Sequence, residues 1–309
     1  MIPRIDAAAL IDPEHIGHMT ARESAHFGAS KVGFLTVYNT PIAAQTVAEM
    51  INQYRAFFLL PDVQKADYNM ANTGSNRGWG AAGSEQVDPD ANPDYKQVFD
   101  CGFELADGDP VAGLCLSAYA PNLWPEKPKQ FSEVLRAYYQ ETTAFALDLL
   151  CAIANATDAD GDFFQDKFTR PMALLRGNFY PKRPHWATDR DFGIATHTDY
   201  GCMTLLATDG SPGLEVRKRG GGWIPVTAPV GEFVINFGEM LDIWTQGRIK
   251  ATPHRVLGPT TERISVPLFF NPNHDAVVSP TGSNPVLAGD HLQARFNETY
   301  VHLQTKVKG

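Results

Sequence analysis

The sequence has little of what membrane-bound, exported or nucleic-acid-binding proteins depend on. Its 309 residues include four cysteines, none at C-x-x-C spacing, which argues against a disulfide framework. No run of about 18 apolar residues could cross a bilayer, and acidic residues stand where a signal peptide would be apolar. A formal net charge of −9 argues against a broad surface for nucleic acid or anionic membranes. We therefore expect a soluble cytoplasmic protein with reduced, mostly buried thiols and neither nucleic-acid nor membrane partners; no feature indicates an oligomeric state.

The chain changes character near residue 170. Before that point, apolar residues recur at three- and four-residue spacing over 47–58 and 131–153, which predicts two helices. An Asp-Pro pair predicts an earlier helix over 13–29. Residues 66–128 are rich in glycine, proline, asparagine and aspartate, so we expect irregular structure there.

Shorter segments of β character follow in the second half. They read MALLRGNFY, CMTLLAT, GLEVRK, WIPVTA, EFVINF and RISVPLFF, with turn-forming residues between them. Many short strands at close spacing are typical of a β-sandwich or barrel, not of a parallel sheet with crossover helices. Since no linker divides the halves, we predict one domain, 1–309, with a helix-rich N-terminal region (1–170), a mainly β core (171–280) and a C-terminal segment (281–309).

A His-Thr-Asp tripeptide, His197 to Asp199, is the first candidate for chemistry. On an extended strand, residues two apart point to the same side, so both side chains can reach one ion. His254 lies in ATPHRV, a short β-like segment that can supply a third ligand. Two imidazoles and one carboxylate leave coordination positions open and are typical of non-haem Fe(II) oxygenases. Taken alone, the H-x-D pair is also compatible with a turn, a surface pair or a buried structural histidine.

Two further pairs show the same spacing. Arg263 and Ser265 in ERISVPLFF would face one side of a strand together with Phe269. A guanidinium beside a hydroxyl forms a receptor for a carboxylate, because arginine donates two charge-assisted hydrogen bonds in a fixed fork. Asn178 and Tyr180 in LLRGNFYP form the second pair, and the tyrosine hydroxyl could donate to the same carboxylate. A surface arginine and an ordinary half-buried aromatic remain the alternatives.

These motifs belong to a longer pattern that resembles a known family. The matching stretches are IPRIDAAAL, GFLTVYN, YRAFFLLPDVQK, NLWP, LLRGNFYP, THTDYGCMTLLATDGSPGLEV, WIPV, GEFVINFGEMLDIWTQGRIKATPHRV and ERISVPLFFNP. Together they resemble the isopenicillin N synthase-like branch of the Fe(II)/2-oxoglutarate-dependent dioxygenases. The resemblance covers nearly the whole chain and is densest over 172–273.

The resemblance implies a fold and a set of roles. The core would be a double-stranded β-helix, or jelly roll, buttressed by N-terminal helices. The implied iron ligands are His197, Asp199 and His254. The implied anchors for the distal carboxylate of 2-oxoglutarate are Arg263, Ser265 and Tyr180, with Asn178 a weaker member. No catalytic residue beyond the metal ligands is implied, and Fe(II), 2-oxoglutarate and O2 are the expected cofactor and co-substrates.

Two residues depart from the family pattern, and three others are candidate substrate contacts. Gly177 and Phe179 depart from a segment that more often reads L-N-Y in the family, although neither removes the asparagine or the tyrosine. Arg77 and Trp79 lie in the irregular N-terminal stretch, where the family tends to build substrate walls. We take these two residues, together with Phe269, as candidate substrate contacts.

The implied activity is oxidation of an unactivated C–H bond of a small molecule by hydroxylation or desaturation, with 2-oxoglutarate converted to succinate and CO2. An isopenicillin N synthase-type four-electron oxidase that uses no 2-oxoglutarate is the alternative, and the position of Tyr180 favours the co-substrate version. A non-catalytic binding protein would have no need for three metal ligands. A zinc hydrolase is disfavoured because H-E-x-x-H is absent.

Overall fold

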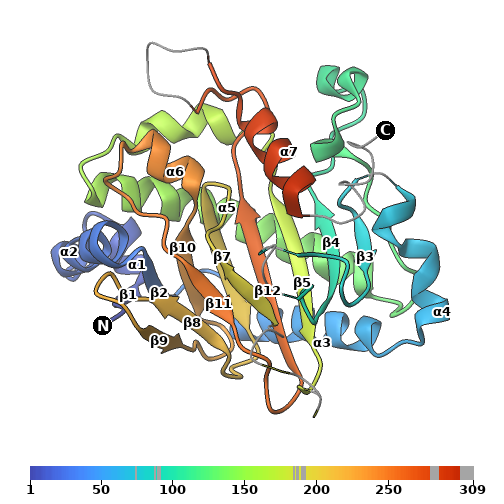
Figure 1. Ribbon diagram of the computed structural model, residues 1–309. Helices are drawn as coiled ribbons and strands as arrows, with labels where there is room; N and C mark the ends of the chain where they lie inside the picture. The colour runs from blue at the N-terminus through green and yellow to red at the C-terminus, as the bar shows by residue number, and fades with distance from the viewer. Residues whose placement is uncertain are drawn as a thin grey trace.

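The computed structural model of the chain shows two β-sheets that face each other, with long helices on the outer side of the larger sheet (Figure 1). The described residues are 1–73, 75–86, 88, 92–183, 185, 188, 193–278 and 285–299. This arrangement is the jelly roll that the resemblance predicted, and the prediction is confirmed.

Eight strands form the larger sheet, in the order β1-β2-β10-β7-β12-β5-β4-β3. They are β1 (Arg4–Asp6), β2 (Phe34–Tyr38), β3 (Gly78–Gly80), β4 (Gln97–Gly102), β5 (Leu174–Tyr180), β7 (Met203–Thr208), β10 (Phe233–Phe237) and β12 (Arg263–Phe270). The smaller sheet has the order β6-β11-β8-β9. Its strands are β6 (Ile194–His197), β8 (Leu214–Arg217), β9 (Trp223–Val226) and β11 (His254–Val256).

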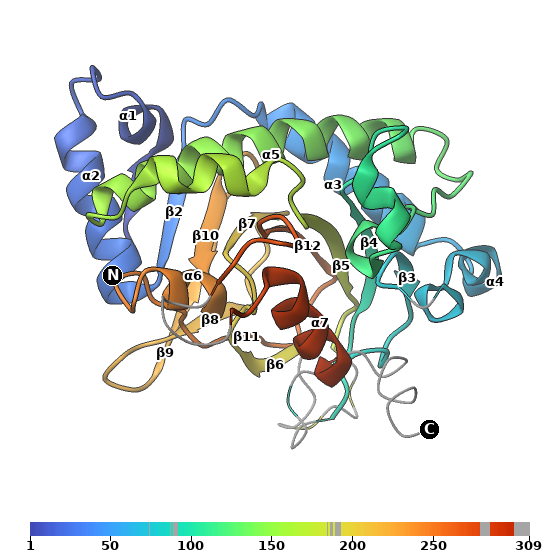
Figure 2. The same cartoon turned by 90° about the horizontal axis from the view of Figure 1, so that it is seen from above.

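The helices include both of the long ones that were predicted. They are α1 (Ala7–Ile11), α2 (His18–Phe27), α3 (Ala44–Phe58), α4 (Asp62–Lys65), α5 (Phe131–Ala156), α6 (Glu239–Trp244) and α7 (Ala288–Thr299). A π-helical turn (Gly28–Val32) follows α2, and short 3-10 turns lie at Ala66–Tyr68, Met70–Asn72, Pro110–Leu114, Ser117–Tyr119 and Gly161–Phe168. Figure 2 shows α5 lying across the larger sheet, with α3 beside it.

The prediction of a helix over 13–29 is wrong at its start. Asp6, not Asp12, caps the first helix, because its side chain accepts a hydrogen bond from the Ala9 N–H. Asp12 is extended and ends α1 (φ −89°, ψ 109°). The chain then turns before the next helix begins at His18.

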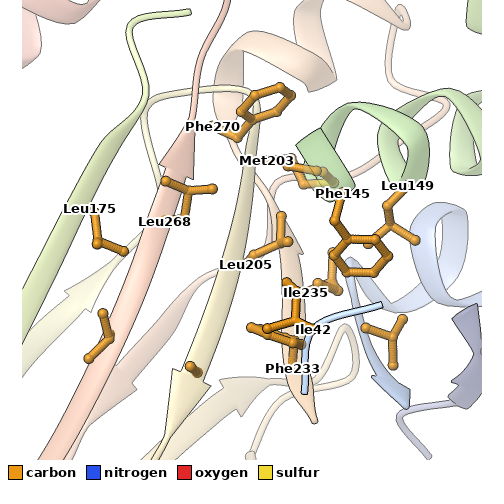
Figure 3. Close-up of a cluster of buried hydrophobic side chains, with 14 of the residues drawn as sticks. Ile42, Phe145, Leu149, Leu175, Met203, Leu205, Phe233, Ile235, Leu268 and Phe270 are labelled. Carbon is orange, nitrogen blue, oxygen red and sulfur yellow. The ribbon is translucent and has the colours of Figure 1, made fainter. Parts of the chain in front are cut away.

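The strand β12 alternates as the sequence predicted. Ile264, Val266, Leu268 and Phe270 are at most 1% exposed and pack in the main core. In Figure 3, residues of this face lie in one apolar layer with side chains of β7, β10 and α5, among them Met203, Leu205, Phe233, Ile235, Phe145 and Leu149. Full burial of such a side chain contributes roughly 1.5–3 kcal/mol. The opposite face of β12 is therefore held against the space between the two sheets.

The segment predicted to be irregular, 66–128, contributes two strands. In this segment β3 pairs with β4, and β4 pairs with β5, so both extend the larger sheet at its edge. Short strands that contain glycine, such as Gly-Trp-Gly in β3, carry no clear period-2 signal. The helix-rich N-terminal region thus completes the sheet as well as packing on it.

Gly177, one of the two departures from the family pattern, lies in the middle of β5 against an aromatic ring. A Cβ built on Gly177 would lie 2.2 Å from the Cδ1 of Tyr54. Tyr54 is fully buried, and its ring centroid is 5.5 Å from that of Phe131. The ring therefore occupies the space that a side chain at this position would need.

We expect Gly177→Ala to lower the free energy of unfolding by about 1–3 kcal/mol, because the buried ring and the strand must move apart. Urea unfolding of the variant and the wild type measures the difference. Gly113→Ala is the matched control, since a Cβ there meets no atom within 4 Å. Equal stability of the two variants would contradict the close contact.

None of the helices in the described part of the chain has the length and apolar character that a bilayer crossing requires. All four cysteines are free. Cys101 and Cys202 are buried, whereas Cys151 is partly exposed and Cys115 is exposed.

Candidate metal centre and adjoining cavity

The two histidines of the predicted triad lie opposite each other in the smaller sheet. His197 ends β6 and His254 begins β11, and the antiparallel register pairs the two residues directly. Their ring centroids are 4.3 Å apart. Asp199 follows two residues after His197, so local chain geometry brings two candidate ligands together and strand pairing brings the third.

The candidate ligand atoms converge on one point. Asp199 Oδ1 lies 3.7 Å from the Nε2 of His197 and 3.7 Å from the Nε2 of His254. One ligand atom from each of the three residues lies within 4.8 Å of the other two. Since nitrogen and oxygen ligands bind first-row metals at about 2.0–2.2 Å, these separations suit a single ion.

Backbone carbonyls fix the protonation of both imidazoles. The Nδ1 of His197 lies 2.8 Å from the carbonyl oxygen of Ala195, and the Nδ1 of His254 lies 3.2 Å from that of Thr252. A carbonyl can only accept, so each Nδ1 donates its proton there. The lone pair of each Nε2 is then left for a metal.

Asp199 is oriented by two donors. Its Oδ2 accepts hydrogen bonds from Thr204 Oγ1 at 2.5 Å and from Asn236 Nδ2 at 2.6 Å. Both donors come from the cavity side of the larger sheet, on β7 and β10. Because Oδ2 is occupied in this way, Oδ1 is the oxygen available to an ion.

Burial favours the metal-binding protonation states. It lowers the pKa of His197, and burial together with the neighbouring His197 lowers the pKa of His254 to about 4. For Asp199, burial alone would raise the pKa, but the two histidines and the hydrogen bonds lower it. Neutral imidazoles and an ionised carboxylate are the forms that coordinate a cation.

The predicted carboxylate receptor forms one end of the cavity. Arg263 pairs with Tyr180 and Ser265 pairs with Asn178 across β12 and β5, and all four residues are at most 2% exposed. The guanidinium carbon of Arg263 lies 5.0 Å from the centroid of the Tyr180 ring. The four side chains therefore share one face, as their spacing predicted.

Arg263 is buried, and one nitrogen of its guanidinium group donates no hydrogen bond to a described residue. Its Nε contacts the carbonyl oxygen of Ser211 at 3.4 Å, and its Nη1 has no hydrogen-bond partner among the described residues. A buried guanidinium without an anionic partner is energetically costly. This end of the cavity therefore fits the carboxylate of an anionic ligand.

The cavity itself, about 120 Å³, lies between the sheets. The triad and the four predicted anchors all line it. Apolar side chains complete the wall near them, namely Ile194, Leu206, Leu214, Val256 and Phe269. The rest of the wall includes Glu85, Lys96 and Arg176, together with Leu292, Phe296 and Thr299 of α7.

The structure separates the three candidate substrate contacts. Phe269 lines the cavity. Arg77 lines a smaller neighbouring one, where it donates to the carbonyl oxygen of Ala118 at 2.6 Å. Trp79 is buried and donates to Gln97 Oε1 at 3.0 Å, and it is not among the described residues that line the main cavity.

Sequence reasoning missed the charged residues and the α7 residues of the cavity wall. Arg176 had a signal, since it is two residues before Asn178 on a predicted strand. Glu85 and Lys96 had none, because they belong to a segment predicted to be irregular. The helix α7 reaches the cavity only because the folded chain brings it there, and residue spacing in the sequence cannot predict that contact.

Comparison with known proteins places these features in a family. Residues 171–272 match the profile of the 2OG-Fe(II) oxygenase superfamily. Residues 2–127 match the profile described as non-haem dioxygenase in morphine synthesis N-terminal. The two matches cover the region of the triad and anchors and most of the helix-rich N-terminal region.

Individual relatives agree with the profiles. A homoarginine-6-hydroxylase of Arabidopsis thaliana is 30% identical over 291 residues, which cover 90% of this chain and 87% of the relative. The 2-oxoglutarate-dependent dioxygenase caaD of Aspergillus niger is 30% identical, with coverage of 87% and 84%. The crystal structure of a full-length Neurospora crassa protein in complex with alpha-KG has a TM-score of 0.83 at 25% identity, and the match covers 96% of each chain.

Proposed function

Because this chain belongs to the 2OG-Fe(II) oxygenase superfamily, we propose that His197, Asp199 and His254 hold its Fe(II) ion. The chain is a 2-oxoglutarate-dependent dioxygenase that acts on a small molecule. Support for the assignment of the ligands comes from the convergence of their Nε2 and Oδ1 atoms and from the carbonyls that hold both imidazoles in the correct tautomer.

Arg263, Ser265 and Tyr180 form the proposed anchor of 2-oxoglutarate, with Asn178 beside them. The observation that carries this assignment is the unpartnered Nη1 of Arg263, since a dicarboxylate would neutralise the buried charge. The hydroxyl groups of Ser265 and Tyr180 can donate to the same carboxylate. Asn178 Oδ1 also has no hydrogen-bond partner among the described residues and belongs to a residue that lines the cavity.

Bound iron and 2-oxoglutarate supply the oxidation of an unactivated C–H bond, as hydroxylation or desaturation, with release of succinate and CO2. The protein residues position these groups and keep water away. Ile194, Leu206, Leu214 and Val256 provide an apolar wall around the anchors, which strengthens electrostatic interactions inside the cavity.

The four-electron oxidase that uses no 2-oxoglutarate is not favoured. Two of the similar proteins are named for 2-oxoglutarate, and one matching structure was solved in complex with alpha-KG. The pairing of Tyr180 with Arg263 in the cavity wall also suits a small dicarboxylate.

The test is spectroscopic. Anaerobic addition of Fe(II) and 2-oxoglutarate is expected to produce a visible metal-to-ligand charge-transfer band, because the keto acid chelates the iron. Exposure to air is then expected to release succinate slowly, even without a substrate.

Protein given Fe(II) alone and protein given 2-oxoglutarate alone are the controls, and neither should show the band. If the complete mixture shows no band and forms no succinate, the assignment of both sites is incorrect.

A further inference from the structure

The helix α7 contributes side chains to the wall of the main cavity. Figures 1 and 2 show this helix on the other side of the larger sheet from α5. Leu292 and Phe296 line the main cavity and also the smaller neighbouring one, so they form part of the partition between the two. The position of α7 therefore decides the shape of the cavity in which a substrate is oxidised.

The proposed ligand Asp199 lies in the short connection between β6 and β7, the metal loop (residues 198–202). Its neighbours Thr198 and Tyr200 line the cavity with it. The N–H of Glu239, the first residue of α6, donates to the carbonyl oxygen of Asp199 at 2.8 Å. The backbone of α6 thus supports the loop without the help of any side chain.

The side chain of Glu239 connects the metal loop to α7. Its Oε1 accepts a hydrogen bond from Thr198 Oγ1 at 2.7 Å. Its Oε2 accepts one from Nη2 of Arg295, on α7, at 2.5 Å. The two charged side chains are 24% and 37% exposed, so solvent screens the ion pair and its contribution to global stability is small. Its main effect is to fix where α7 lies relative to the loop.

Tyr200 makes a second connection to the same helix. Its hydroxyl lies 2.6 Å from Thr299 Oγ1, and since that threonine donates its own proton to the carbonyl oxygen of Arg295 at 3.1 Å, the tyrosine is the donor. The Nε2 of His291 lies 3.0 Å from the carbonyl oxygen of Tyr200, which can only accept. Both sequence neighbours of Asp199 are therefore attached to α7, one of them through Glu239.

Apolar burial holds α7 only weakly. Among the described residues of this helix, Leu292 is the only large apolar side chain that is buried, and Phe296 is partly exposed. The other buried residues are Ala288, Gly289 and Thr299. A helix with one large apolar anchor gains little from the hydrophobic effect, so its polar contacts with the metal loop decide its position.

We propose that Glu239 and Tyr200 are positioning residues that fasten α7 to the metal loop and thereby hold Leu292 and Phe296 in the cavity wall. This inference rests on the proposed function, because it assumes that Asp199 holds the metal ion. An ion that fixes Asp199 also fixes its two neighbours and, through them, the helix. The substrate-side wall is then set by the state of the metal site.

The link acts in both directions. If a filled metal site stabilises the docked helix, the docked helix strengthens the metal site by the same factor. A substrate that packs against Leu292 and Phe296 would therefore stabilise the metal loop from the opposite side of the cavity.

Hydrogen exchange of the α7 amides tests the link without turnover. Peptides within residues 288–299 are followed by mass spectrometry in the full chain, first without metal and then with Fe(II) and 2-oxoglutarate in the absence of oxygen. Loading is expected to slow exchange in α7 of the wild type by about fivefold or more, as is typical of coupling between two sites. The helix α2, which packs on α1 and α5, is the internal reference.

Two variants break the two connections separately. In Glu239→Gln the side chain has one acceptor oxygen and cannot serve Thr198 and Arg295 together, and in Tyr200→Phe the hydroxyl is missing. Each variant is expected to reduce the slowing by severalfold, and the double variant to abolish it. Glu239→Gln should still form the charge-transfer band, because the backbone bond to the metal loop remains.

The matched control is Glu298→Gln. Glu298 pairs with Arg295 at 3.1 Å from within α7, so the control removes a carboxylate from the same arginine and leaves the bridge through Glu239 in place. The slowing of exchange on loading should match that of the wild type. A merely structural role of Glu239 would instead speed exchange equally with and without the metal.

The outcomes separate this inference from the proposed function. A missing charge-transfer band in the loaded wild type contradicts the proposed function and, with it, the link. A normal band with no change of exchange in α7 contradicts the link alone. Full slowing in the double variant contradicts the roles of Glu239 and Tyr200. Arg295→Met breaks the same bridge from the side of α7 and decides the role of Glu239 if Glu239→Gln does not fold.

Discussion

Replacing Asp199 by alanine is expected to abolish iron binding and to reduce succinate formation by more than about 100-fold, because the only anionic ligand of the proposed triad is lost. The two histidines would remain at their cross-strand positions, with a centroid separation of 4.3 Å in the parent protein. Two neutral imidazoles bind Fe(II) far more weakly than the complete facial set. Iron content after gel filtration, together with the anaerobic charge-transfer band, measures the loss.

Asn236→Ala is the graded control for this variant. It removes one of the two donors that fix Asp199 Oδ2 but leaves the carboxylate in place. Loss of such an orienting partner typically lowers metal affinity by about 10–100-fold. An Asp199→Ala protein that keeps iron as well as Asn236→Ala does would refute the assignment of Asp199 as a ligand.

Arg263→Met is expected to raise the KM for 2-oxoglutarate by roughly 100-fold or more and to leave iron binding intact. Truncating one partner of a buried charge pair costs about 2–5 kcal/mol, and the fork of Arg263 is the one buried cation assigned to the co-substrate. Titration of succinate formation against 2-oxoglutarate, at saturating iron, measures the change. Ser265→Ala removes a single neutral donor and should give a much smaller increase.

Thermal unfolding provides a readout that is independent of turnover. Without 2-oxoglutarate, Arg263→Met should melt at or above the temperature of the wild type, because it removes a buried guanidinium whose Nη1 has no partner among the described residues. Adding 2-oxoglutarate should then stabilise the wild type and not the variant. Equal stabilisation of both proteins would mean that the anion binds elsewhere.

The features predicted correctly depend on short-range geometry. The alternation of β12 follows from strand geometry alone, so the shared face of Arg263, Ser265 and Phe269 could be deduced from their spacing. The same holds for Asn178 and Tyr180 on β5. The helices α3 and α5 were predicted because their apolar stripes run for many residues.

What could not be predicted depends on contacts between distant segments. The helix predicted over 13–29 was given too early a start because an Asp-Pro pair resembles a helix start, whereas α2 begins at His18 after Gly17, which offers no side-chain cap. Glu85 reaches the cavity through a chain segment that runs beside β4, and its partner Arg176 is distant in sequence. A contact between two such distant residues produces no regular spacing in the sequence, although the charged residues themselves can be read from it.

The division of the site between the two sheets has a mechanical consequence. The smaller sheet supplies the histidines through β6 and β11, whereas the larger sheet supplies Arg263, Ser265 and Tyr180 through β12 and β5. The separation between the two sheets therefore sets the distance between the histidines and the carboxylate anchors. The opposite face of β12 packs in the main core with α5, so that core governs the gap. Repacking of the core can thus retune co-substrate affinity without touching any residue of the cavity.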